Sequence, residues 1–273
     1  MQVISLSLAH LGLGLLMILS LIGLREVGRG FFTLCGWSGV ALSGAGLALS
    51  AFPDRTSVAA SDACSLLPWG LAATAFAFFT ASWLALRAGR RDAAAPFHRA
   101  LGIAAGLAVA SQGWSLAVGK THNVPVGMLA LAVADFLLSA ALLGGVTLAM
   151  ILGHWYLVQP GLAIEPLRRL AWLFIGLLAA RTLMEAGEAA GAIVAGRISL
   201  PPPAGEVLAF PALVLAQRVL FGLAGPLLLA PLVYRTVVMR STMSATGLLY
   251  VAVALVWVGE FLSKYLLLPL RLV

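Results

Sequence analysis

Long apolar stretches alternate along the chain with short polar breaks. A helix needs about 20 apolar residues to cross a hydrocarbon layer about 30 Å thick. Eight stretches meet this length, at 3–24, 31–52, 66–86, 100–119, 126–158, 168–196, 208–234 and 243–270. The breaks between them are too short to hold a separate folded domain. The pattern predicts an all-α fold, a single transmembrane bundle of eight helices that covers residues 1–273.

Two of the predicted spans carry signs of irregularity. The fifth is long enough to tilt or to project beyond the bilayer, and Gly144-Gly145 could kink it. We expect one helix there, because two spans would need about 40 residues. In the seventh, Pro211, Pro226 and Pro231 predict kinks that free backbone carbonyls to line a cavity.

Arginine and lysine are distributed unequally between the two sides of the predicted bundle. The breaks after the odd-numbered spans hold ten arginines: Arg25, Arg29, Arg87, Arg90, Arg91, Arg99, Arg168, Arg169, Arg235 and Arg240. The other side holds four basic residues: Arg55, Lys120, Arg197 and Arg271. Because basic residues concentrate in cytoplasmic loops, both termini and Cys64 are predicted to lie outside, in the periplasm of a Gram-negative cell.

Composition agrees with a membrane protein and excludes several other classes. Hydrophobic residues make up 62% of the chain and charged residues 10%, and the mean hydropathy is +1.04. Soluble domains carry about 25% charged residues, so a soluble enzyme and a disordered chain are excluded. The net charge of +7 is spread over short breaks, which favours membrane loops over nucleic-acid binding.

Seven ionisable residues fall inside the last four predicted spans. They are Asp135, Arg181, Glu185, Glu188, Arg218, Glu260 and Lys264. The first half of the chain, 1–122, is weakly charged and holds no comparable set of intramembrane charges. All seven charges lie in 123–273 and are predicted between mid-membrane and the outer surface. An Arg or Asp at mid-membrane costs about 2.5–3.5 kcal/mol, so such residues need partners, water or a ligand. We expect either a polar site that handles protons, a quinone head group or an ion, or a structural network of salt bridges.

The spacing of these charges places several of them on shared helix faces. Arg181, Glu185 and Glu188 follow an i, i+4, i+7 pattern, and Glu260 and Lys264 follow i, i+4. Residues with this spacing lie on the same side of a helix. Each set could therefore pair internally or face a shared cavity.

Small-residue motifs at GIAAG (102–106) and GEAAG (187–191) predict close contacts between helices.

Histidines offer a second set of candidate ligands. His98 and His154 are predicted near the inner face, and His10 and His122 near the outer face. Each pair lies at equal depth, as the two axial ligands of haem b would. The alternative for His154, within His154-Trp155-Tyr156, is an interfacial aromatic belt or a lipid or quinone contact.

The most basic segment is RAGRRDAAAPFHR at 87–99. We expect it to set the orientation of the chain and to contact anionic lipid, with docking of an acidic soluble protein as the alternative.

The last span reads VGEFLSKYLLL at 258–268. Together with the eight predicted spans, the two termini predicted outside and the lack of a soluble domain, this segment makes the chain resemble a known family. The family is the membrane-anchor subunits of the polysulfide-reductase and DMSO-reductase type. The resemblance rests on helix count and on Gly259, Glu260 and Lys264. It implies a quinol site near the outer face and electron transfer to a soluble iron–sulfur partner.

The favoured function is therefore a non-catalytic subunit of a bacterial electron-transfer complex in the inner membrane. Its partners would be the lipid bilayer and other subunits, and its cofactor a quinone, with haem b less favoured; no catalytic residue or metal ligand is predicted. Two alternatives stay open. One is a small-solute or proton-coupled transporter or channel, and the other is a structural subunit that binds pigment or lipid.

Overall fold

The computed structural model describes residues 1–51, 66–118, 124–159, 161–194 and 210–270. The described residues form helices and short turns, without a β-strand. Eight helical segments are long and apolar enough to cross a membrane, with the segment Leu213–Val238 counted as one. This confirms the predicted number of spans and indicates a multi-pass membrane protein.

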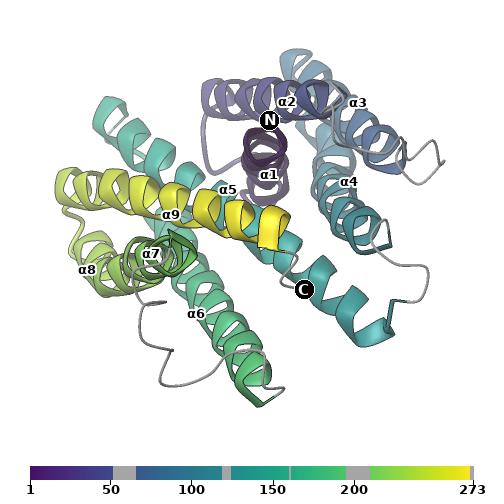
Figure 1. Cartoon of the computed structure of the whole chain (residues 1–273). Coiled ribbons are helices and arrows are strands. Elements are labelled where there is room, and N and C mark those ends of the chain that lie inside the picture. Colours follow the sequence, from purple (N-terminus) through teal and green to yellow (C-terminus); the bar gives the residue numbers. More distant parts are fainter. Residues whose placement is uncertain (52–65, 119–123, 160, 195–209, 271–273) are drawn as a thin grey trace.

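The helices follow the order of the predicted spans (Figure 1). They are α1 (Gln2–Leu19), α2 (Arg29–Ser50), α3 (Leu67–Arg87), α4 (Arg91–Val118), α5 (Val126–Val158), α6 (Glu165–Val194), α7 (Phe210–Gln217), the π-helical segment η3 (Arg218–Ala224), α8 (Gly225–Val238) and α9 (Thr242–Leu270).

Helix α5 lies between two groups of helices (Figure 1). It contacts α1, α2 and α4 on one side and α6 and α9 on the other. One buried apolar cluster joins α1 to α5, α6, α8 and α9, and a second joins α1 and α5 to α3 and α4. Residues of α5 and α1 therefore face partners from both halves of the chain.

The fifth predicted span is a single helix, as expected, and it runs unbroken through Gly144 and Gly145. Gly144 packs against Gly14 of α1, where a Cβ atom on Gly144 would lie 2.1 Å from the Gly14 carbonyl carbon. The glycine therefore permits close contact between the two central helices.

The seventh predicted span is irregular where kinks were expected, but the irregularity has another form. It consists of α7, the seven-residue π-helical segment η3 and α8, with Pro226 in the first turn of α8. A π-helix satisfies backbone groups through wider turns and is frequent at functional sites. Pro231 lies inside the continuous α8, and the side chain of Pro211 is outside the described part of the chain.

Helix α4 begins earlier than predicted, at Arg91 rather than at 100. Much of the basic segment at 87–99 is therefore helical, with Asp92 in the first turn. Within the GIAAG motif, Gly102 faces Ser20, where an added Cβ would lie 1.9 Å from the Ser20 Oγ. This close contact confirms the packing role that the motif predicts.

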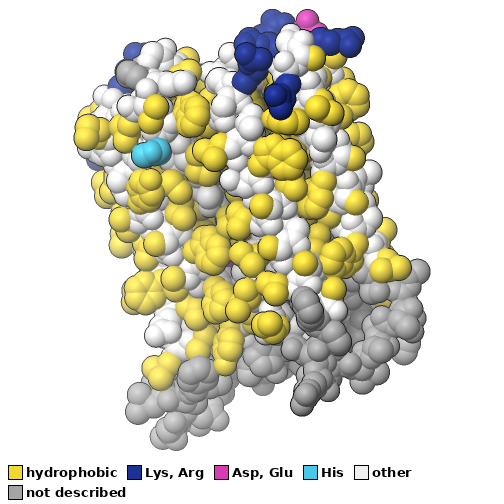
Figure 2. Space-filling view, turned by 90° about the horizontal axis from the view of Figure 1, so that it is seen from above, with side chains coloured by type: hydrophobic (Ala, Val, Ile, Leu, Met, Phe, Trp, Pro, Cys, Tyr) yellow, Lys and Arg dark blue, Asp and Glu magenta, His cyan; other side chains and the backbone are white. Residues whose placement is uncertain are grey.

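The ten arginines that set the predicted orientation lie at one end of the bundle. Arg25 donates to Asp92 at 2.9 Å, and Arg169 pairs with Glu26. These contacts join the α1–α2 turn to the beginnings of α4 and α6. Figure 2 shows blue arginine side chains gathered at one end of the surface, above a largely apolar wall.

Candidate functional site

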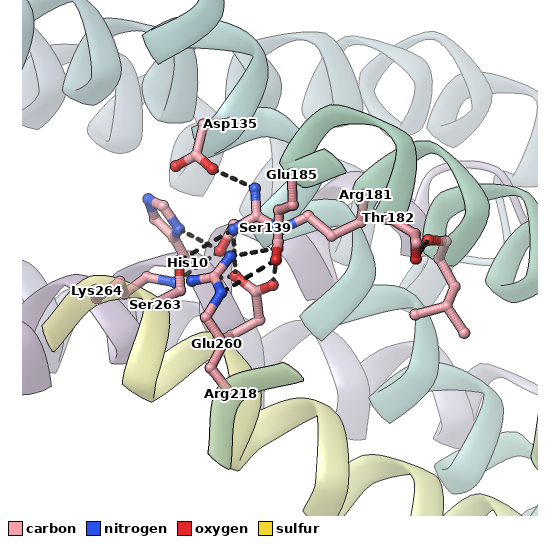
Figure 3. Close-up of polar contacts among 11 residues, drawn as sticks. His10, Asp135, Ser139, Arg181, Thr182, Glu185, Arg218, Glu260, Ser263 and Lys264 are labelled. Atoms are coloured by element: carbon pink, nitrogen blue, oxygen red, sulfur yellow. Dashed lines mark hydrogen bonds and ion pairs between the residues drawn. The ribbon is translucent and has the colours of Figure 1, made fainter. Parts of the chain in front are cut away.

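Six of the seven predicted intramembrane charges form one connected network. They come from α5, α6, η3 and α9, and their side chains converge (Figure 3). At about 1.5 Å per residue, Asp135 lies roughly 14 Å along α5 from Val126, at the end remote from the arginines. The network therefore occupies the half of the bundle away from the arginine-rich end.

Arg181 of α6 is the centre of the network, and its side chain is 1% exposed. Its Nε lies 3.0 Å from Oε1 of Glu260, and its Nη2 donates to Oε2 of the same carboxylate at 3.4 Å. The Nη2 also donates to Ser263 Oγ at 3.2 Å, and Nη1 donates to Asp135. All three guanidinium nitrogens thus have partners, an arrangement that makes strong charge-assisted hydrogen bonds.

Arg218 forms a second centre on η3. Its Nε donates to Oε2 of Glu185 at 3.1 Å, and its Nη2 donates to Oε1. Oε1 of Glu185 also lies 3.1 Å from Nε of Arg181. Glu185 is therefore shared by two arginines.

Close packing of η3 on α9 brings Arg218 to the network. A Cβ on Gly259 would lie 2.1 Å from the Cα of Gly222, so neither glycine can carry a side chain without moving the two segments apart. Gly259 directly precedes Glu260. The close contact of η3 with α9 at Gly259 therefore lies directly beside Glu260 of the network.

Lys264 connects the network to the N-terminal half of the chain. Its Nζ donates to Ser139 Oγ at 2.6 Å and lies 3.6 Å from Oε2 of Glu260. Ser139 Oγ in turn lies 3.2 Å from Nδ1 of His10 on α1. Because the ammonium must donate, the serine hydroxyl is available to donate to His10 Nδ1.

His10 is 1% exposed, and its ring packs edge-on against Phe136 with centroids 4.8 Å apart. Its Nε2 and the Oε1 of Gln112 on α4 are both buried without a hydrogen-bond partner in the described part of the chain. With Nδ1 as acceptor, Nε2 carries the proton and faces the N-terminal group of helices. The sequence pointed to His10 only as one of a haem pair with His122, which lies outside the described residues.

Glu188 does not join the network. It lies on the exposed surface of α6 and has no hydrogen bond or ion pair within the described residues. Gly187 and Gly191 beside it have open space where a Cβ would be. The close helix contact that GEAAG predicts is therefore not made inside the described part of the chain.

The two histidines predicted near the inner face lie in different surroundings. His98 is buried, with Nε2 3.1 Å from the Ile22 carbonyl oxygen and its ring edge-on to Phe32. His154 is exposed on α5. No hydrogen bond or ring contact joins these two described residues, and nothing in the described regions groups three or more His, Cys, Asp or Glu side chains as metal ligands.

The network balances three basic against three acidic side chains: Arg181, Arg218 and Lys264 against Asp135, Glu185 and Glu260. Isolated buried charges each cost several kcal/mol, which pairing and hydrogen bonding offset. Glu185 and Glu260 each contact two bases, so either carboxylate can keep one partner while it releases the other. Such sharing suits a site through which a charge or proton moves.

The sequence identified the charged members but missed Ser139, Ser263 and His10. A signal for the two serines was present: Ser139 lies four residues after Asp135, and Ser263 three residues after Glu260, so each shares a helix face with a charge. His10 is far away in sequence, and no local pattern links it to the network.

No family model matches the chain, and no curated protein matches it in sequence.

Proposed function

We propose that this chain is a non-catalytic integral subunit of an electron-transfer complex in a bacterial inner membrane, and that its buried network passes protons. The observation that carries the proposal is the continuous contact from Glu185 through Arg181, Glu260 and Lys264 to Ser139 and His10. Intramembrane ionisable groups with named partners are typical of proton relays.

The exposed fractions of the carboxylate side chains indicate where protons could enter or leave the network. The side chains of Asp135 and Glu185 are 20% and 15% exposed, whereas Glu260 is 6% exposed. Asp135 and Glu185 have exposed surface through which protons could be exchanged, whereas Glu260 is enclosed. Protons would therefore enter or leave through Asp135 and Glu185.

Arg218 supports a quinone site as a second candidate. Its Nε and Nη2 are engaged by Glu185, while its Nη1 has no partner among the described residues. A free guanidinium N–H can donate to a quinone carbonyl. Glu185 would then stand beside the quinone to accept the proton that a quinol releases.

The test compares Glu185→Gln with Glu165→Gln on the same helix, where Glu165 is a surface residue paired with Arg168. In vesicles of the native membrane we expect Glu185→Gln to slow proton-coupled, quinol-driven electron flow about a hundred-fold, the lower end of what a positioned acid or base contributes. Glu165→Gln should leave it unchanged. Unchanged flow in Glu185→Gln, with normal amounts of inserted protein, would overturn the proposal.

Purification in mild detergent from the native membrane separates the alternatives. Co-purifying iron–sulfur or haem subunits, or bound quinone, would support an electron-transfer complex. Solute uptake by the protein alone in proteoliposomes would indicate a transporter instead. Pigment absorbance in the purified chain would indicate a structural, pigment-binding subunit.

A further inference from the structure

A hollow of about 490 Å³ opens at the arginine-rich end, between the end of α1 and the beginning of α4. We call it the arginine hollow; its charged lining consists of Arg25, Glu26, Arg91, Asp92 and Arg99. It lies outside the ion-pair network and takes no part in the proposed function.

The arginines of the hollow differ in whether they already have partners. Arg25 pairs with Asp92 at 2.9 Å, and Glu26 pairs with Arg169. The guanidinium groups of Arg91 and Arg99 make no hydrogen bond or ion pair with any described residue, and both side chains are exposed. Both acidic groups of the lining are thus neutralised, and two exposed guanidinium groups remain.

The helical register of α4 directs both free arginines to the hollow. Arg91, Ala95 and Arg99 are spaced at i, i+4 and i+8, so they lie on one helix face, and all three line the hollow. About 12 Å of helix separates Arg91 from Arg99. Two flexible arginine side chains can converge over that distance on one phosphodiester, which guanidinium groups bind in a bidentate manner.

The remaining wall of the hollow is largely apolar. Leu21, Ile22 and Leu24 line it, and Leu21 is 60% exposed. These residues directly follow α1, which is long and apolar enough to cross a membrane, so in a bilayer they would lie where acyl chains meet head groups. A free phosphate ion would leave this apolar wall uncovered, whereas the acyl chain of a phospholipid would pack against it.

We propose that the arginine hollow binds the head group of an anionic phospholipid, with its phosphate on Arg91 and Arg99 and its acyl chain along Leu21 and Leu24. A zwitterionic lipid presents an ammonium group next to its phosphate, which the nearby arginines repel. The hollow therefore selects anionic over zwitterionic lipids.

The test measures binding of a fluorescent phosphatidylglycerol to the purified full-length chain in mild detergent, with fluorescent phosphatidylcholine as the comparison. Each arginine near a membrane surface contributes about 1 kcal/mol, so Arg91→Gln with Arg99→Gln should weaken phosphatidylglycerol binding about thirty-fold. The matched control is Arg235→Gln with Arg240→Gln, two exposed arginines in the region of the α8–α9 turn that do not line the hollow. The control should retain binding.

Three results would overturn the proposal. Equal losses in the two double variants would mean diffuse attraction to surface charge. Equal affinity for the two lipids would remove the selectivity. An acidic protein that co-purifies through Arg91 and Arg99, in place of lipid, would identify a protein-docking surface. Thermal unfolding of both double variants in detergent shows whether they are folded.

Discussion

Ser139 is the single side chain through which Lys264 reaches His10 in the described network. It is 1% exposed, so no bulk water replaces it. A hydroxyl can accept from the ammonium and donate to the imidazole at once, which an alanine cannot do. In the proposed proton path, the hydroxyl is therefore the link between Lys264 and His10.

We expect Ser139→Ala to slow proton-coupled electron flow at least tenfold. One hydrogen bond to a charged group is worth about 1.5–3 kcal/mol, and 1.4 kcal/mol corresponds to a factor of ten in rate. Ser111→Ala is the control, because Ser111 is a buried serine whose side chain, among the described residues, bonds to the Ala108 carbonyl of its own helix. Equal rates in the two variants would exclude His10 from the path.

At the scale of residues, the sequence predicted which side chains are charged inside the membrane but not which of them pair. An arginine in a membrane helix requires a partner, and this requirement pointed correctly to Arg181. The choice among Asp135, Glu185 and Glu260 depends on how α5, α6 and α9 pack. Glu188 shares a helix face with Arg181 by spacing, yet it lies seven residues, or about 10 Å, along the axis and makes no ion pair with a described residue.

At the scale of elements, the contact of η3 with α9 sets the position of Arg218. The π-helical turn widens the backbone just where the arginine begins it, and Gly222 and Gly259 let the two segments touch. Prolines in the sequence indicated an irregular span. They did not indicate the π-helical form of η3.

Gly259→Ala should therefore lower the free energy of unfolding by about 1–3 kcal/mol, the usual cost of inserting a methyl group into a packed contact. Gly247→Ala on the same helix is the control, since a Cβ there meets nothing within 4 Å. Thermal unfolding in detergent measures both. If Gly259→Ala were as stable as Gly247→Ala, the close approach of η3 and α9 would be wrong, and with it the placement of Arg218.

At the scale of the whole molecule, the network and the arginines occupy opposite ends of the bundle. Eight helices and the gathering of basic residues at one end follow from composition and spacing alone, because each span must be apolar and long. The hollow between α1 and α4 does not follow in this way, since it depends on the earlier beginning of α4 at Arg91. That beginning places the arginines of the basic segment on an ordered helix face.

The arginine-rich end should face the cytoplasm, by the preference of basic residues for that side. In spheroplasts, a membrane-impermeant maleimide should then label Cys64, which is predicted outside, and Cys64→Ser should abolish the labelling because Cys35 is 0% exposed. In the Cys64→Ser background, Arg240→Cys should react only after the membrane is broken. The reverse pattern would place the network in the inner half of the bilayer, so that Asp135 and Glu185 would exchange protons with the cytoplasm. The orientation thus decides on which side of the membrane the proposed path releases its proton.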